Sequence, residues 1–359
     1  MASVHGAVAD RTRTMVPAVV AAGLWVPAQI AYPLTTGVAR DRVTVVVVLL
    51  AAATALLHAW SVRGFRWAGA VFAILAGVGI LAEIVGTATG YPFGCYDYAV
   101  GRLGPAVAGV PLVVPLAWTG GLYPVWVVAR RLAGSMPGRI VVTAVGAVGW
   151  DLFLDPQMVA DGQWHWCAAH SGLPGLAAIP WTNYLGWFAV ALVLAGLLEL
   201  AGRPDRGSRE SLPDTVRRTQ EAAPGPVRGT PETVPGPVRG TPETVPRQVR
   251  GTRETVPRPV HGTRDAGPRP VRGTRETVPG PVRGTADAGP VDGYRTRFDV
   301  PVVNETRDAL PVAVFLWTWL GSTLAHAVFL GLPASAGYGF AGLGALGIPL
   351  LARIGCRRR

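Results

Sequence analysis

Two aspartates four residues apart, Asp151 and Asp155, lie in the segment GWDLFLDPQMV (149–159), inside an otherwise apolar stretch. On a helix this spacing puts both side chains on one face. An ionised carboxylate in hydrocarbon is costly unless something compensates it. A carboxyl group in an apolar site can instead stay protonated at neutral pH, and a second carboxyl group beside it favours that state further. The pair could therefore act as a buried acid.

A third carboxyl group, Glu83, and the imidazole of His326 lie on other apolar segments. With a rise of about 1.5 Å per helical residue, all four groups reach a similar depth in the outer half of a bilayer. This match predicts one polar pocket formed by several helices. For each acid the alternative is a structural hydrogen bond between helices, and His326 alone is more simply a satisfied core residue.

Aromatic side chains gather in the same part of the chain, in YPFGCYDY (91–98), WHWCAAH (164–170) and IPWTNYLGWF (179–188). Aromatic faces stabilise a cation without trapping it covalently, and an amide can hold a water. The candidate substrate-binding residues are Tyr96, Trp118, Trp150, Asn183 and Trp187, and further candidates are His326, Tyr91 and His165. We assign Trp166 and Trp181 to the interfacial aromatic belt of a membrane protein. His165, Cys167 and His170 match no recognised metal-ligand spacing, so we expect no metal.

The apolar runs that carry these residues predict an all-α, polytopic bundle of transmembrane helices. The expected spans are 15–34, 43–62, 68–90, 105–129, 139–160, 182–202, 310–332 and 335–353. The last run is short and rich in glycine, so seven spans are the alternative to eight.

Arginines predict the orientation of these spans. All 33 basic residues are arginine, and the outer loops of an eight-span arrangement hold only Arg40, Arg42 and Arg102. Positive charge concentrates on the cytoplasmic side of membrane proteins. We therefore expect a multi-pass protein of the cytoplasmic membrane with both termini inside. The net charge of +11 then reflects topology and gives no reason to expect a nucleic-acid partner.

Residues 203–298 differ in character from the rest of the chain, because an eleven-residue unit, PVRGTPETVPG at 226, recurs there. Proline and glycine at this density, with little apolar surface to bury, predict a disordered cytoplasmic linker. The expected division is helices one to six with the active site in 1–202, the linker in 203–298, and helices seven and eight with a basic tail in 299–359.

The three cysteines form no CxxC pair. Cys95 and Cys167 fall on outer loops and could meet, but loop thiols are more often free, and we expect these to be free.

The quoted motifs, together with LGPAVAGVPLVVPLAW (103–118), resemble a family of integral membrane carotenoid-biosynthesis proteins that includes carotenoid 1,2-hydratases and the bacterioruberin-pathway hydratase. The resemblance implies addition of water to the terminal carbon–carbon double bond of an acyclic carotenoid, giving a tertiary alcohol without a cofactor. The partners would be the carotenoid, water and the bilayer, and other enzymes of the pathway could associate. In this scheme Asp151 or Asp155 donates the proton, and Glu83 is the third candidate.

Two other functions fit parts of the pattern. DLFLD has the DxxxD spacing with which membrane prenyltransferases, including carotenoid elongases, bind magnesium diphosphate, although the predicted spans contain no second DxxxD and no arginine in the pocket. A non-enzymatic lipid or carotenoid carrier could also use buried carboxyl groups to couple protons to transport.

Overall fold

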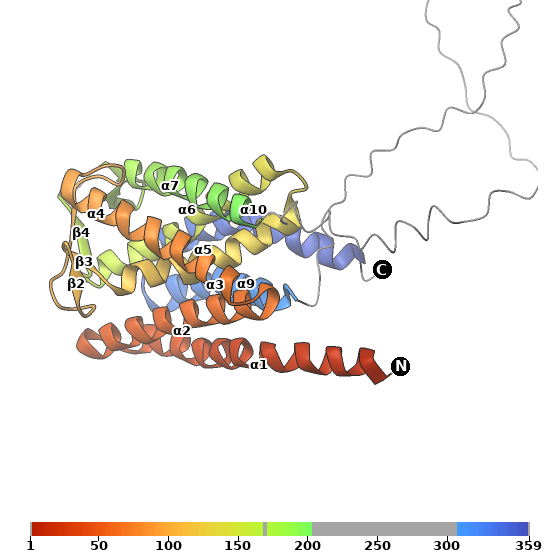
Figure 1. Cartoon of the computed structure of the whole chain (residues 1–359). Coiled ribbons are helices and arrows are strands. Elements are labelled where there is room, and N and C mark those ends of the chain that lie inside the picture. The colour runs from red at the N-terminus through yellow and green to blue at the C-terminus, as the bar shows by residue number, and fades with distance from the viewer. Residues whose placement is uncertain (1, 168–170, 203–306, 358–359) are drawn as a thin grey trace, which may run out of the picture. The chain divides into compact units, whose positions relative to one another are not determined.

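Long apolar runs form long helices, as expected, and these helices pack side by side (Figure 1). The computed structural model describes residues 2–167, 171–202 and 307–357. The helices before and after the segment 203–306 belong to one compact unit. The expected repeat-rich linker at 203–298 lies outside the described residues.

The first half of the bundle begins with two long helices and a broken third one. Its elements are α1 (Ala2–Ala31), the 3-10 turn η1 (Tyr32–Leu34), α2 (Gly37–Arg63), α3 (Phe65–Phe72), the π-helical turn η2 (Ala73–Val78) and α4 (Gly79–Thr89). Because α3, η2 and α4 are continuous, they form one membrane-length segment over Phe65–Thr89.

The second half contains α5 (Val113–Leu132), α6 (Met136–Ala160), α7 (Trp181–Ala201), α9 (Ala309–Leu324), the π-helical turn η4 (Ala325–Phe329) and α10 (Pro333–Arg357). Short strands fill the connections: β1 (Tyr96–Tyr98), β2 (Ala106–Val107), β3 (Val110–Pro111), β4 (Trp164–Trp166), β5 (Gly172–Leu173) and β6 (Leu176–Pro180).

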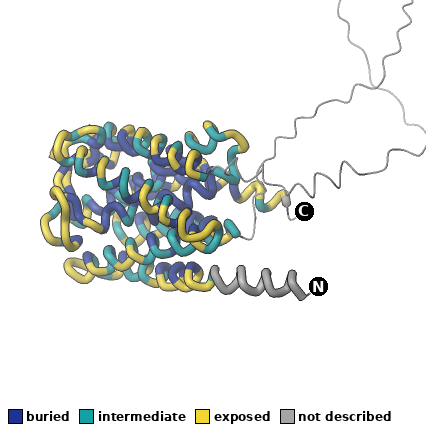
Figure 2. Tube along the Cα trace, in the orientation of Figure 1, coloured by how far each residue is buried: buried dark blue, intermediate teal, exposed yellow. Residues whose placement is uncertain are grey.

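Seven helical segments among the described residues are long and apolar enough to cross a membrane. This confirms the predicted multi-pass helical bundle. The remaining long helix, α5, has 20 residues, and its tryptophan, tyrosine, glycine and proline residues lower its hydropathy. It is buried along most of its length (Figure 2), so it is the central helix of the bundle. The prediction placed its start at 105, whereas residues 106–111 form the β2–β3 hairpin and α5 begins at Val113.

Small residues let the central helices approach closely. A Cβ atom at Gly149 of α6 would lie 2.6 Å from the backbone of Gly342 on α10, and one at Gly120 of α5 would lie 2.7 Å from the Cβ atom of Ala51 on α2. Membrane helices commonly associate through such small residues, because van der Waals contact replaces the hydrophobic effect there. These contacts bring α6 close to α10 and α5 close to α2. The closely packed helices hold the polar residues in position.

The strands lie together at one end of the bundle (Figure 1). There β1 pairs with β4 in antiparallel register, with Tyr96 opposite Trp166 and Tyr98 opposite Trp164. Next to this pairing, Cys95 and Cys167 form a disulfide bond, so the expectation that they are free is wrong. The thiols are brought together by the pairing of β1 with β4, two segments that are distant in sequence. No local sequence pattern predicts that pairing.

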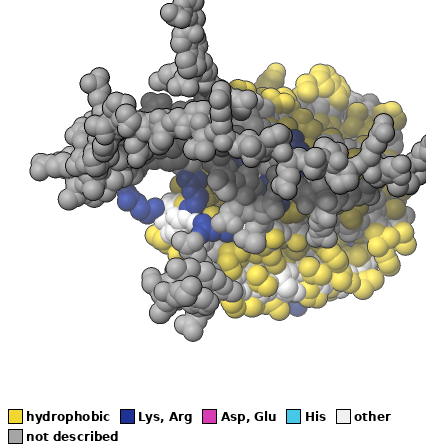
Figure 3. All heavy atoms as spheres, turned by 90° about the vertical axis from the view of Figure 1, so that its right-hand side faces the viewer, with side chains coloured by type: hydrophobic (Ala, Val, Ile, Leu, Met, Phe, Trp, Pro, Cys, Tyr) yellow, Lys and Arg dark blue, Asp and Glu magenta, His cyan; other side chains and the backbone are white. Residues whose placement is uncertain are grey.

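Arginines gather at the opposite end, where α1 begins and α10 ends (Figures 1 and 3). Arg139 donates to Glu199 at 2.7 Å, and Trp126 donates to the same carboxylate at 3.0 Å. The guanidinium groups of Arg63 and Arg130 stack over Trp67 and Trp126 respectively. Charge and aromatic rings therefore mark this end, as at a membrane interface.

The disulfide predicts a test of the strand-rich end. We expect Cys95→Ser to lower the free energy of unfolding by about 2–4 kcal/mol, because the bond closes a loop with a sequence separation of 72 residues. Thermal unfolding of the detergent-purified chain measures this, with Cys356→Ser, at an exposed free thiol, as the matched control. Equal melting temperatures for the two variants would contradict the prediction.

Candidate active site

Helix α6 presents Asp151 and Asp155 on one face, and α7 brings Asn183 against them. The Asn183 Nδ2 group donates to Asp151 Oδ2 at 2.9 Å and also to Asp155 Oδ2. The two carboxyl groups interact with each other as well. All three side chains are buried, and Oδ1 of Asp151 receives no donor from the described protein. One amide thus holds a coupled pair of acids inside the bundle.

Glu83 on α4 forms a second carboxylate centre. Its Oε2 atom accepts from the hydroxyl of Tyr96 and from that of Tyr98 at 2.8 Å, and its Oε1 atom accepts from Trp118 Nε1 at 2.9 Å. Burial and the nearby Glu83 raise the pKa of the Tyr96 and Tyr98 hydroxyls above their ordinary value. Both therefore remain O–H donors, and Glu83 acts as the acceptor in every one of these bonds.

The paired strands β1 and β4 explain how two loops reach this centre. Side chains alternate between the two faces of a strand, so Tyr96 and Tyr98 share a face with Trp164 and Trp166 and turn inward. The ring centroids of Tyr98 and Trp164 are 5.4 Å apart. The Trp164 ring also lies close enough to the Asp155 carboxyl group to interact with it. The strand pair thus connects the Glu83 centre to the aspartate pair.

Tryptophans from three helices form an aromatic wall beside the acids. Trp118 of α5 and Trp187 of α7 stack face to face, with centroids 4.1 Å apart and planes at 9°. Trp150 of α6 meets Trp187 edge-on at 5.5 Å, and Phe93 lies 6.5 Å from each member of the stack. Such a wall can stabilise a positive charge by cation–π attraction.

These groups border a cavity of about 530 Å³. Its polar wall includes Glu83, Asp155 and Asn183, and its aromatic wall includes Trp118 and Trp187. The rest of the lining is mostly apolar and comes largely from α1, α2, α5, α6 and α9. Asp155, 4% exposed, reaches the cavity wall, whereas Asp151, at 0%, lies one helical turn away behind it. The structure therefore distinguishes the two acids by position.

Most sequence-predicted site residues meet at this cavity. Those on its wall are Glu83, Tyr96, Trp118, Trp150, Asp155, Asn183 and Trp187. Asp151 lies behind Asp155, and three other predicted residues lie elsewhere. Tyr91 is 78% exposed, His165 is exposed on the outward face of β4, and His326 is buried against Gln157 and Ser335.

Among the lining residues that sequence reasoning missed are Tyr98, Gln157, Trp164 and Trp166. Trp166, assigned from sequence to the interfacial belt, lies on the cavity wall and donates to the carbonyl of Phe93 at 3.1 Å. The alternation in YDY and WHW is the signal that could have found three of them, because it places every second side chain on one face of a strand.

Comparison with known proteins agrees with the family expected from the motifs. Residues 43–216 match the family described as carotenoid biosynthesis protein. Over 137 residues the chain is 31% identical to the bisanhydrobacterioruberin hydratase of Haloarcula japonica, a match that covers 37% of this chain and 44% of the relative. The chain therefore spans less than half the length of that curated relative. No solved structure matches the chain significantly.

Two glycines near the Glu83 centre give a matched test of this geometry. A Cβ atom at Gly79 would lie 2.9 Å from Cγ of Trp118, whereas one at Gly77 would meet nothing within 4 Å. We expect Gly79→Ala to displace the Trp118 ring and to lower the free energy of unfolding by about 1–3 kcal/mol. Gly77→Ala should change it by about 0.5 kcal/mol or less. Thermal unfolding and tryptophan fluorescence measure both, and equal behaviour of the two variants would refute the packing.

Proposed function

Because residues 43–216 match the carotenoid biosynthesis family, we propose that this membrane protein hydrates the terminal carbon–carbon double bond of an acyclic carotenoid. The reaction is acid-catalysed, needs no redox cofactor and gives a tertiary alcohol. The observation that carries the proposal is the position of Asp155, on the wall of an apolar cavity beside stacked tryptophans. The name of the Haloarcula relative, a hydratase, supports the same reaction class.

Asp155 is the proton donor in this proposal, and Asp151 is its partner. Two buried carboxyl groups in contact avoid a double negative charge by holding one proton between them. That proton would also satisfy Oδ1 of Asp151, which has no other donor among the described residues. Asn183 orients both acids and donates to either when it is ionised. Transfer of the proton from Asp155 to the less substituted alkene carbon leaves a tertiary cation.

The cation is stabilised by the groups opposite the acid. The stacked Trp118 and Trp187 rings present π electrons to the cavity, and Glu83 supplies a fixed negative charge. Three donors hold the Glu83 carboxylate in place, so it is pre-organised and cannot easily attack the cation. Water then adds to the cation, and the proton it releases returns to the aspartate pair.

The shape of the cavity supports a long apolar substrate. Its lining extends from the acids to Trp25 on α1, to Val48 on α2 and to Trp317 on α9. These helices belong to the segments that are apolar enough to span a membrane. A polyene could therefore place one end at Asp155 while the rest of the molecule lies among α1, α2 and α9 towards the lipid.

The rival functions leave different traces. A prenyl diphosphate needs cationic groups or metal-bound carboxylates, yet no arginine lines this cavity in the part of the chain that the structure describes. Two of the three carboxyl groups are joined by Asn183, and the third is occupied by aromatic donors. The geometry thus favours acid catalysis over diphosphate chemistry. A carrier would leave the pigment chemically unchanged, which the next experiment detects.

The central prediction concerns the aspartate pair. We expect Asp155→Asn and Asp151→Asn each to remove hydrated product, a loss of about 100-fold or more, while the protein still inserts in the membrane. Each variant is expressed in a host that makes an acyclic carotenoid, and the pigments are weighed by mass spectrometry for the gain of water.

Asp97→Asn is the matched control, because Asp97 lies on the exposed face of β1 in the same hairpin. It should keep the hydrated product. Unchanged gain of water in both pair variants would defeat the proposal. Magnesium-dependent turnover of a prenyl diphosphate, or movement of unaltered pigment between membranes, would replace it with one of the rivals.

We also propose that the strand-rich end faces outward and that both chain ends lie in the cytoplasm. Disulfide bonds persist in oxidising compartments outside the cytoplasm, and the Cys95–Cys167 bond lies at that end. Arginines cluster at the other end, as the positive-inside rule predicts for the cytoplasmic side. Chemistry and charge therefore support the same orientation in the cytoplasmic membrane.

Cys356, the exposed free thiol, tests this orientation. A membrane-impermeant maleimide should label it in inside-out vesicles and leave it unlabelled in intact cells. The Cys356→Ser variant gives the background signal. Labelling from the outside of intact cells would place the C-terminal end outside and overturn the orientation.

A further inference from the structure

The cavity has a second polar region that the acid mechanism does not use. Tyr32 on η1 and Gln157 on α6 line its wall, and both side chains take part in hydrogen bonds that lead away from the aspartate pair. Gln157 lies only two positions after Asp155. No hydrogen bond described for these residues joins them to Asp151, Asp155 or Asn183, so the two regions are neighbours with separate partners.

A chain of hydrogen bonds fixes this region from its buried end. His326 Nε2 is hydrogen-bonded to Gln157 Oε1 at 3.0 Å, and His326 Nδ1 is hydrogen-bonded to Ser335 Oγ at 2.9 Å. The hydroxyl of Ser335 donates in turn to the carbonyl of Leu152 at 2.7 Å. With its oxygen held by His326, the Gln157 side chain also lies close enough to the Tyr32 hydroxyl to interact with it. The orientation of the amide is therefore set by a histidine that does not itself line the cavity.

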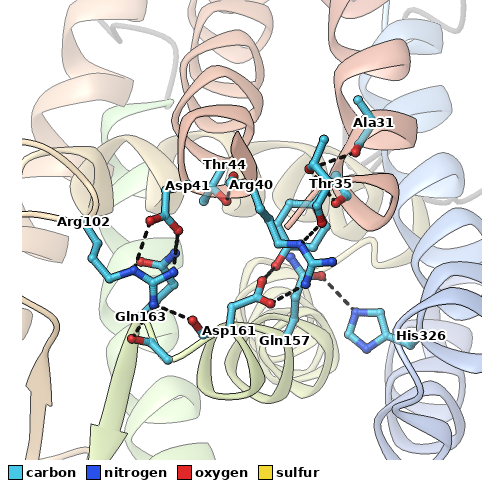
Figure 4. Close-up of polar contacts among 12 residues, drawn as sticks. Ala31, Thr35, Arg40, Asp41, Thr44, Arg102, Gln157, Asp161, Gln163 and His326 are labelled. Carbon is cyan, nitrogen blue, oxygen red and sulfur yellow. Dashed lines mark hydrogen bonds and ion pairs between the residues drawn. The ribbon is translucent and has the colours of Figure 1, made fainter. Parts of the chain in front are cut away.

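At its other end, this series of hydrogen bonds extends to the protein surface. The Tyr32 hydroxyl donates to Asp161 Oδ2, and Asp161 forms an ion pair with Arg40 (Figure 4). The Arg40 guanidinium lies 5.4 Å from the centroid of the Tyr32 ring. The side chains of Arg40 and Asp161 are 16% and 11% exposed, so they connect the cavity wall to the surface.

Burying this many polar groups beside an apolar cavity is costly unless they are satisfied or used. Hydration requires one water molecule at the cation, delivered into a space that otherwise excludes water. We propose that Tyr32 and Gln157 form the water port of the cavity, the place where one water molecule enters. Water would pass the partly exposed Arg40–Asp161 ion pair and be held by Tyr32 and Gln157 until it attacks the cation. His326 is a positioning residue for the Gln157 amide. This inference rests on the proposed hydratase function.

A second polar cluster at the same end provides a control. Arg102 donates to Asp41 at 2.7 Å, Gln163 donates to the same carboxylate, and Asp41 and Gln163 are buried (Figure 4). None of these three side chains lines the cavity. Gln157→Leu and Gln163→Leu are therefore the same substitution at a half-buried and a buried glutamine, and only Gln157 lines the cavity.

The test separates proton transfer from water capture. Membranes containing the full chain are equilibrated in D₂O and supplied with lycopene, an acyclic carotenoid with trisubstituted terminal double bonds. After Asp155 transfers a deuteron to the alkene, a cation that gains no water loses a proton from a neighbouring methyl group to the Asp155 carboxylate. The result is an isomerised alkene that carries one deuterium and no added oxygen. Mass spectrometry distinguishes it from the hydrated product.

We expect Gln157→Leu and Tyr32→Phe to lower the ratio of hydrated product to deuterated alkene at least tenfold, with total deuteration retained. His326→Gln should shift the ratio in the same direction. Gln163→Leu should leave the ratio unchanged even where instability lowers the yield.

An unchanged ratio in both port variants, with deuteration retained, would overturn the water port and leave the hydratase intact. Absence of both products from the unmutated chain would instead refute the proposed function. Loss of both products in Gln157→Leu and in Tyr32→Phe, with normal insertion, would show a structural role and also overturn the port.

Discussion

Glu83, Asp151 and Asp155 are buried at the candidate site, and the need to satisfy these three carboxyl groups organises the surrounding structure. A buried charge must be paired or hydrogen-bonded, yet no arginine reaches them among the described residues that line the cavity. Uncharged side chains donate the hydrogen bonds to these carboxyl groups instead. Asn183 serves Asp151 and Asp155, while two tyrosines and a tryptophan serve Glu83. These donors satisfy the carboxyl groups without bringing a positively charged side chain to the cavity.

This constraint explains why the loops at the strand-rich end are structured. The donors to Glu83 include Tyr96 and Tyr98, which lie outside the helices and need a rigid frame to point inward. Pairing of β1 with β4 and the adjacent disulfide provide that frame. The same pairing places Trp164 against Asp155. A short extramembrane sheet thus completes a site whose acids come from the helices.

Periodicity and charge in the sequence were sufficient to predict the bundle and the meeting of the acids. Apolar runs locate the helices because lipid requires every backbone group to be bonded within a segment. The four-residue spacing of Asp151 and Asp155 gives their common face. The predictions that failed concern contacts between segments that are distant in sequence and lie outside the helices. The pairing of 96–98 with 164–166, and with it the disulfide, depends on contacts that no local pattern encodes. The inward tilt of Trp166 and the exposure of His165 follow from that pairing alone.

Gln157 shows another limit of sequence reasoning. Its neighbour Asp155 is conspicuous because a carboxyl group is rare in an apolar run, whereas an amide two positions later draws no attention. Its significance comes from its partners, His326 on η4 and Tyr32 on η1, which are distant in sequence. His326 was predicted to join the acids at a common depth, and the structure bonds it to Gln157 instead. Similar depth was therefore insufficient to assign it a partner.

An acid that must protonate an alkene has to be kept from bulk water, because water would solvate the carboxylate and compete for the proton. The cation that follows nevertheless needs one water. These demands conflict if acid and water share a single hydrated channel. In this cavity Asp155 is hydrogen-bonded to Asn183, whereas Gln157 is bonded to His326 and Tyr32 to Asp161. Under the proposed hydratase function, these separate partners would keep the acid dry while a single water is held close to the carbon that it attacks.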